Sequence, residues 1–280
     1  MLKLPEPMDN FRFQDEIRLE PINLARAALC YAREIGYPAL AVDDYLLRLD
    51  DLAAGAGDFV DADASTLVRA EQLAGYLFEQ VGFQGNSANY SDPRNSFLNE
   101  VIDRRLGIPI TLSAIFLSVA KRLALPARGV GLPGHFIVSV QGDNGPLFLD
   151  PFYRGQQLSI IACARLVELS TGYNGPFQPE WLEPVQPLDI LARMLNNLRT
   201  IYIQQGKQRM LLPVVERLAW LQPDNPNYLR DFGMIYQQNG SLGKAVEYYQ
   251  RYLTLAPQAA DAGQVRQNLL ETAQKLAQRN

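Results

Sequence analysis

Residues 107–128 read GIPITLSAIFLSVAKRLALPAR, and this stretch decides the fold. From Pro109 to Leu123 the side chains are apolar on almost every face of a helix. The two charges, Lys121 and Arg122, fall in the last turn, where they suit the helix dipole. A helix that is apolar on all sides is buried. The stretch therefore predicts a central, buried helix that begins at a proline.

The pattern changes after Pro126 to short strand-like runs, over residues 127–132, 135–141 and 147–150. The last two runs are joined by GDNG at residues 142–145, which is typical of a hairpin. The only histidine of the chain, His135, lies on the second run, and Asp150 closes the third. We therefore predict a small antiparallel sheet that carries an imidazole and a carboxylate.

Helical periodicity dominates the rest of the first 186 residues. Helices are predicted from residue 22 to a stop at 36–38, over about 39–54, from 64 or 66 to 82, over about 95–105 and over about 159–169. Residues 171–188 then hold four prolines among glycine and asparagine turn residues. This density predicts a domain boundary, which divides the chain into residues 1–186 and residues 187–280.

The second of these domains repeats itself with a period of 34 residues. The shift superimposes Tyr202 on Tyr236 and Gly206 on Gly240. The second copy has apolar, aromatic, small and proline residues at the positions that define a tetratricopeptide unit. We predict two such units and a final helix, over about 262–278, that caps them. Whether this tail binds a peptide or only buttresses the first domain stays open.

Composition and charge restrict the partners. The net charge is −4, and the mild split between an acidic front and a basic tail gives no reason to expect nucleic acid. No run approaches the roughly 20 apolar residues that span a bilayer, and the N-terminus lacks a signal-peptide core. We therefore expect a cytoplasmic protein without a membrane partner, and we expect a protein or peptide as its partner. The oligomeric state stays open.

Cysteine and histidine are scarce. Two cysteines and one histidine are too few for a zinc site, and we expect neither a metal nor a cofactor. Cys30 and Cys163 are each flanked by apolar residues, which favours buried core thiols.

Three longer runs carry a resemblance to known proteins: NSFLNEVIDRRLGIPITLS at residues 95–113, GVGLPGHF at 129–136 and LDPF at 149–152. The chain resembles the bacterial SirB-type proteins, which join a transglutaminase-like core to a C-terminal tetratricopeptide tail. One F-box protein of animals has a similar core. The resemblance implies an α+β fold, with a mostly helical, papain-like core that has a small antiparallel sheet, followed by an all-α tail.

Catalytic members of that superfamily have a triad of cysteine, histidine and aspartate, and His135 and Asp150 match the last two positions. The resemblance places Pro109 where the cysteine would open the central helix. At that position the helix dipole and an imidazolium would lower the pKa of a thiol, and the carboxylate would orient the imidazole. Proline lacks both the thiol and the backbone N–H that commonly helps to hold an oxyanion.

A hydroxyl in the same helix is the alternative nucleophile. Ser113 lies about 40° from Pro109 in azimuth and one turn deeper, whereas Thr111 is rotated by about 200° and should point away from His135. Four polar residues lead into the central helix and either share the cleft or form a capped, solvated helix face: Asn95, Asn99, Glu100 and Arg104.

The primary expectation is a non-catalytic protein-interaction or regulatory protein, a pseudoenzyme on a transglutaminase-like core. One alternative is an amide-bond hydrolase or transferase in which Ser113 or Thr111 acts with His135 and Asp150. Another is a sensor that binds a ligand or peptide at His135 without chemistry.

Overall fold

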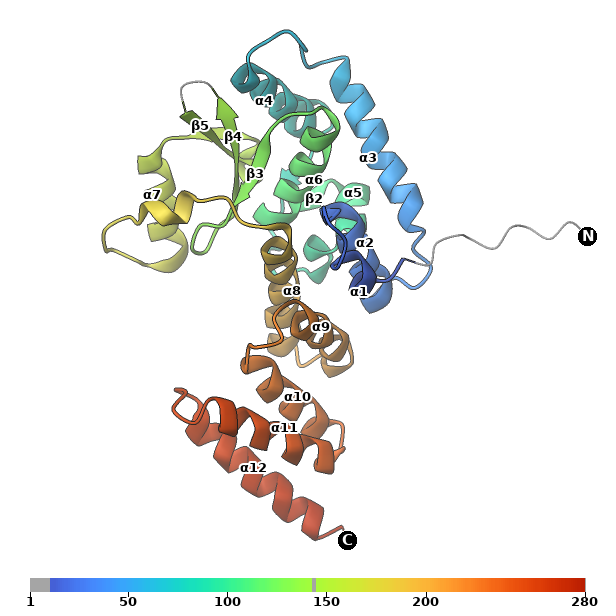
Figure 1. The fold of residues 1–280 in the computed structure, drawn as a ribbon, viewed down its shortest axis with the longest axis vertical. Helices are drawn as coiled ribbons and strands as arrows, with labels where there is room; N and C mark the ends of the chain where they lie inside the picture. The colour runs from blue at the N-terminus through green and yellow to red at the C-terminus, as the bar shows by residue number, and fades with distance from the viewer. Residues whose placement is uncertain (1–10, 143–144, 280) are drawn as a thin grey trace, which may run out of the picture. The chain divides into compact units, whose positions relative to one another are not determined.

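The computed structural model describes residues 11–142 and 145–279, and the chain divides into two compact units, Met1–Met194 and Leu195–Asn280 (Figure 1). The division falls inside helix α8 (Pro187–Gln204), which begins at the predicted boundary. Within the described residues, no helix combines the length and the apolar character that crossing a bilayer requires.

The first unit is mostly helical and has two small sheets, which confirms the predicted α+β class. Its helices are α1 (Phe13–Glu16), α2 (Leu24–Ile35), α3 (Val42–Gly57), α4 (Thr66–Gly75), the π-helix η1 (Tyr76–Gln80), the 3₁₀ turn η2 (Pro93–Ser96), α5 (Leu98–Arg104), α6 (Pro109–Arg122), the 3₁₀ turn η3 (Pro151–Tyr153), α7 (Ile160–Thr171) and the 3₁₀ turn η4 (Pro179–Leu182). Its strands are β1 (Gln84–Gly85), β2 (Leu106–Gly107), β3 (Ala127–Val130), β4 (Ile137–Gly142), β5 (Gly145–Asp150) and β6 (Gln156–Leu158).

Helix α6 is the centre of the first unit, as predicted. It packs against α2, α3, α4 and α5, and also against β3 and β4 of the sheet (Figure 1). All residues from Pro109 to Phe116 are buried. The helix ends in a reversal at Ala124, whose φ is 51°. There the Leu125 N–H donates to the Ala120 carbonyl and the Ala124 N–H donates to the Lys121 carbonyl.

Strands β3 to β6 form an antiparallel sheet in chain order, with Val138 opposite Leu149. Helix α7 packs on this sheet through a buried apolar cluster that includes Ile137, Phe148 and Val167. Strands β4 and β5 pair as the predicted hairpin requires, whereas turn residues 143–144 lie outside the described residues. Strand β6 and the short parallel pair of β1 and β2 are additional to the predicted elements.

Three predicted elements differ from the structure, because the backbone departs locally from a regular helix or strand. The strand predicted from residue 135 begins at Ile137, because His135 lies in a turn where its N–H donates to the Leu132 carbonyl at 3.2 Å. The helix predicted up to residue 82 is α-helical only to Gly75 and continues as η1. The helix predicted over 95–105 is split into η2 and α5, because Phe97 between them has an extended backbone.

The second unit is all helical: the rest of α8 is followed by α9 (Gln208–Leu221), α10 (Asn227–Gln238), α11 (Leu242–Leu255) and α12 (Ala262–Ala277). Gly233 of α10 faces α11 so closely that a Cβ atom there would lie 2.4 Å from the ring of Tyr249. Tyr249 and Tyr252 are buried in the core of this repeat. The small Gly233 and the aromatic Tyr249 therefore pack α10 against α11, as the 34-residue pattern predicts.

Candidate functional site

Asp150 holds the imidazole of His135. Its Oδ2 atom lies 2.8 Å from His135 Nε2, and its Oδ1 atom accepts hydrogen bonds from the backbone N–H groups of Phe152 (2.9 Å) and Tyr153 (3.4 Å). The carboxylate thus caps η3, the turn that Pro151 begins. Asp150 is wholly buried, so these three bonds fix both its position and its orientation.

The ring of His135 is enclosed by aromatic side chains. It stacks on Tyr153 with a centroid distance of 6.3 Å and meets the edge of Phe152 at 6.2 Å. Only 8% of the residue is exposed. Because Nε2 faces Asp150, Nδ1 is the nitrogen left for another group, and no residue in the described part of the chain hydrogen-bonds to it.

The first turn of α6 carries no nucleophile at its start. Pro109 is the first residue of the helix and Ile108 precedes it as the cap. The Thr111 hydroxyl is engaged, since it accepts from the Ile108 N–H at 3.1 Å and donates to the Asn95 carbonyl at 2.8 Å. Thr111 therefore caps the N-terminal end of α6, and no hydrogen bond in the described residues joins it to His135.

Ser113 is buried, and its Oγ atom has no hydrogen-bond partner among the described residues, His135 included. The structure therefore brings His135 and Asp150 together and does not link Ser113 to them. The hydroxyl is also closed to solvent.

Both cysteines are buried. Burial, and next the negative charge of Asp150, raise the pKa of Cys163 to about 11, so this thiol is protonated at neutral pH. Cys163 lies in the apolar cluster beneath α7, as a structural thiol does. Cys30 is also buried, and its Sγ atom lies 3.7 Å from the Phe11 carbonyl.

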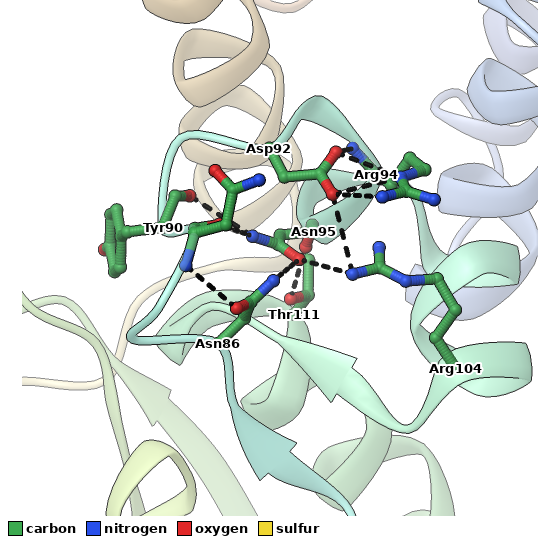
Figure 2. A network of polar contacts seen from close by, with 8 residues as sticks. Asn86, Tyr90, Asp92, Arg94, Asn95, Arg104 and Thr111 are labelled. Atoms are coloured by element: carbon green, nitrogen blue, oxygen red, sulfur yellow. Dashed lines mark hydrogen bonds and ion pairs between the residues drawn. The ribbon is translucent and has the colours of Figure 1, made fainter.

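A buried polar network holds the loop before α5 (Figure 2). Asn95 Nδ2 donates to the carbonyls of Asn89 (2.8 Å) and Tyr90 (3.2 Å), while its Oδ1 accepts from Asn86 Nδ2 (3.0 Å) and Arg104 Nη2 (3.3 Å). Asn95 is wholly buried, so the expectation of a solvated helix face is wrong at this position. Its four bonds explain why a polar side chain lies in the core.

Charge reinforces the same network. Asp92 pairs with Arg94 at 2.8 Å and lies 3.6 Å from Arg104. Burial alone would raise the pKa of Asp92, but the hydrogen bonds and charge of Arg94, with the charge of Arg104, outweigh it and hold the pKa below its usual range. Asn99 is buried too, whereas Glu100 is half-buried. Of the four polar residues named from the sequence, Asn95 and Arg104 therefore serve the loop and not the imidazole.

Two residues at the candidate site were not predicted. Tyr90 projects from the loop away from the network and packs on Phe152 at 6.0 Å (Figure 2). Arg193 of α8 donates through Nη2 to the carbonyls of Leu132 and His135, both at 2.9 Å, and no described carboxylate pairs with it. They come from segments far apart in the sequence, and no local pattern joins them to His135.

The described residues contain no group of three or more His, Cys, Asp or Glu side chains that could hold a metal ion. The polar groups at the candidate site are thus an oriented imidazole, a buried carboxylate, a guanidinium without an acidic partner and two phenols. This set can bind a polar group but offers no hydrogen-bonded nucleophile.

The second unit has its own candidate binding surface on α10 and α11, formed by the half-buried rings of Tyr236 and Tyr248 together with the buried ring of Phe232. Tyr236 and Tyr248 stack at 5.5 Å, and Phe232 lies 5.0 Å from Tyr248. Two cations cover these rings: Lys244 Nζ lies 5.1 Å from the Tyr236 centroid, and the Arg251 guanidinium lies 5.4 Å from that of Tyr248. We call these five residues the tyrosine surface.

Fold and site together define a transglutaminase-like core followed by tetratricopeptide repeats. Residues 43–196 match the transglutaminase-like superfamily, and residues 198–269 match the tetratricopeptide repeat. A UPF0162 protein of Xylella fastidiosa is 33% identical over 266 residues, which cover 92% of this chain and 93% of the relative. The chain therefore belongs to the transglutaminase-like superfamily and, within it, to the UPF0162 family.

Other relatives are similar over less of the chain. A UPF0162 protein of Pseudomonas aeruginosa is 33% identical over 210 residues, 75% of this chain and 76% of the relative. F-box only protein 21 of Pongo abelii is 28% identical over 210 residues, which cover 70% of this chain and 32% of that protein. The similarity to an animal F-box protein agrees with the resemblance noted from the sequence, whereas the SirB-type membership stays a prediction.

Proposed function

We propose that this chain is a non-catalytic protein-interaction protein, built on a transglutaminase-like core that lacks its nucleophile. One observation carries the proposal: α6 begins at Pro109, and the paired His135 and Asp150 have no thiol or hydroxyl hydrogen-bonded to them within the described residues. An imidazole without a nucleophile to activate does not start acyl transfer.

The enclosure of His135 supports the same function. The imidazole is stacked by Tyr153 and fixed by Asp150, so it contributes to the packing of η3 against the rest of the core. Tetratricopeptide repeats typically mediate contacts between proteins, and the tyrosine surface combines aromatic rings with two cations. Such a surface suits an acidic or aromatic peptide segment of a partner.

Turnover assays test the absence of catalysis. The full chain is incubated with glutamine-containing peptides and with simple peptide amides, while the release of ammonia and of cleaved peptide is followed. We expect no turnover above the buffer background, and the same trace for His135→Ala purified in the same way. Turnover that disappears in His135→Ala would show that the core is an active enzyme.

A binding experiment tests the interaction role. The double variant Lys244→Glu, Arg251→Glu reverses both cations of the tyrosine surface, while Lys207→Glu, Arg209→Glu makes the same charge change at exposed positions elsewhere in the tail. Proteins captured by the wild-type chain should be lost with the first variant and retained with the second. Equal capture of these proteins by both variants would show that the tyrosine surface does not bind them.

A second candidate function is an amide-bond hydrolase or transferase that uses the Ser113 hydroxyl. It is favoured by one observation, the buried Ser113 Oγ atom without a hydrogen-bond partner. A serine-reactive fluorophosphonate distinguishes the two functions, because it should label Ser113 only in an active enzyme. Labelling that Ser113→Ala abolishes would establish the alternative.

A further inference from the structure

A cavity of about 800 Å³ opens at the C-terminal end of α6, away from the start of that helix where Pro109 lies. Four segments of the first unit and Asp50 of α3 line it; the segments are residues 21–25 at the start of α2, residues 117–122 of α6, residues 124–129 leading into β3, and the stretch from Val185 to Ile190. Arg193 and His135 are not among its lining residues. The cavity is therefore distinct from the candidate site described above.

The walls of this cavity are mostly apolar. They include Ile22, Leu24, Leu117, Leu125, Val185 and Ile190. A concave, largely apolar space of several hundred cubic ångströms with a few polar groups is typical of a site for a small molecule. Its volume is large enough for a chain or ring system of roughly drug size.

The charges at the cavity are not balanced. Arg122 pairs with Asp50 and also donates to the Ser118 carbonyl at 2.9 Å, so this arginine and the only carboxylate among the lining residues satisfy each other. Lys121 and Arg128 also line the cavity, and neither side chain has a hydrogen-bond or ion-pair partner among the described residues. Three cations and one carboxylate leave a net charge of +2.

The Lys121 ammonium does not bond the carbonyls at the end of α6 in the described residues. The last carbonyls already have partners: Ala120 accepts from the Leu125 N–H, Lys121 accepts from the Ala124 N–H, and Leu123 accepts from Arg69 Nη2 at 2.7 Å. Lysine and arginine near a helix end often bond those carbonyls. Because other donors occupy these three carbonyls, the Lys121 ammonium is available to a ligand.

We propose that this cavity binds a small amphiphilic anion, with an apolar chain or ring against its walls and a carboxylate or phosphate held by Lys121 and Arg128. The cations are solvent-exposed at the edge of the cavity, so a bound anion gains charge-assisted hydrogen bonds without requiring an unpaired buried charge. The site stands apart from the proposed interaction function and does not depend on it.

Calorimetric titration of the full chain tests the site with three probes of equal chain length: dodecanoate and dodecyl phosphate, each below its micelle concentration, and 1-dodecanol below its solubility limit. We expect one molecule of an anionic probe per chain and much weaker binding of the alcohol. The two anionic arms identify the head group, since a phosphate site binds dodecyl phosphate more tightly and a carboxylate site binds dodecanoate more tightly. Equal binding of the alcohol would overturn the role of the cations.

Variants locate the binding. Lys121→Gln with Arg128→Gln should weaken the anionic probes by about tenfold or more, because charge-assisted hydrogen bonds contribute about that much in affinity. Lys207→Gln with Arg209→Gln removes the same charge from the tail and should leave the affinity unchanged. Both pairs lie at exposed positions, so all variants should fold.

A filling substitution provides a second readout. Leu117 is half-buried and lines the cavity, so Leu117→Trp should occupy its space and abolish binding while a cooperative melting transition remains. No saturable binding of either anion by the wild-type chain would overturn the proposal. So would binding of many molecules per chain, or equal affinity in wild type, the cavity pair and the filled variant.

Discussion

His135 Nε2 lies 2.8 Å from Asp150 Oδ2, and the other carboxylate oxygen of Asp150 caps the turn η3 that packs against α6. The same carboxylate thus orients the imidazole and caps a turn of the first unit. The pair therefore forms a hydrogen-bonded junction between the sheet and η3, which packs against the central helix. Because of this double role, removal of either side chain should change the free energy of unfolding, whether or not the protein has an activity.

Asp150→Ala should lower the free energy of unfolding by about 2–4 kcal/mol, because it leaves His135 Nε2 and the N–H groups of η3 without their acceptor. Urea denaturation followed by circular dichroism measures the change. Glu247→Ala, at a 63% exposed carboxylate paired with Arg251, is the control and should stay within about 0.5 kcal/mol. Equal losses in the two variants would contradict the structural role of Asp150.

Pro109→Cys should create a thiol whose pKa lies below the ordinary value of about 8.5, because the N-terminal end of α6 favours a thiolate. The thiolate absorbance near 240 nm, titrated against pH and corrected with the wild-type spectrum, gives this pKa. Ser113→Cys places a thiol at a position that is buried like Pro109 but lies one turn inside the helix, so burial should raise its pKa without a helix end to offset it. A pKa for Cys at position 109 as high as at 113 would show that this helix end does not stabilise an anion.

Cys163 should make the wild-type protein lose stability as the pH rises between about 9 and 11. Its pKa in the folded chain is raised to about 11 by burial and by Asp150, from an ordinary value of 9.0. The unfolded chain therefore releases this proton first, and the contribution present below pH 9 is lost as the pH approaches 11. Unfolding free energies of wild type and Cys163→Ala should converge over this range; parallel curves would contradict the shift.

Asn95→Ala should destabilise the chain by about 2–3 kcal/mol, since it removes four hydrogen bonds and leaves buried carbonyls and an amide unsatisfied. Thermal and urea denaturation measure the effect. Asn239→Ala, at an exposed position after α10, is the matched control and should change little. A small effect at Asn95 would mean that water replaces the side chain in the network.

Ala124→Gly should stabilise the chain by about 1 kcal/mol, because Ala124 has a φ of 51° that costs a residue with a Cβ atom energy and costs glycine little. Urea denaturation provides the measurement. Ala54→Gly, at an exposed position in the right-handed helix α3, should destabilise by about 0.5–1 kcal/mol. The same alanine-to-glycine change should therefore raise the free energy of unfolding at position 124 and lower it at position 54. Loss of stability in both variants would contradict a left-handed backbone at Ala124.

The parts of the fold that follow from local pattern could be predicted from the sequence. The continuous apolar run predicted α6 as a buried helix that begins at Pro109, and the 34-residue repeat predicted the helical tail. Elements that depend on distant pairing could not be predicted. Strands β1 and β2 are two residues each and pair only with one another, so neither has a periodicity of its own.

At the candidate site, too, some residues could be predicted from local pattern and others could not. His135 and Asp150 could be predicted because they lie on consecutive strand-like runs, His135 at the start of one and Asp150 at the end of the next, although His135 lies in a turn before β4. Tyr90 and Arg193 reach the site from a loop and from α8, and only the three-dimensional fold brings them near the imidazole. For Asn95 the sequence left open a shared cleft or a solvated helix face; the solvated face is wrong, because four hydrogen bonds permit the burial of this side chain.

Arg193 has a consequence for dissecting the chain into fragments. It lies beyond the proline-rich stretch, on α8, yet its guanidinium bridges the carbonyls of Leu132 and His135 in the first unit. A fragment cut at residue 186 would lose that bridge together with the tail, and any defect it showed would be ambiguous. A fragment designed to contain only the first unit should therefore include α8 at least through Met194.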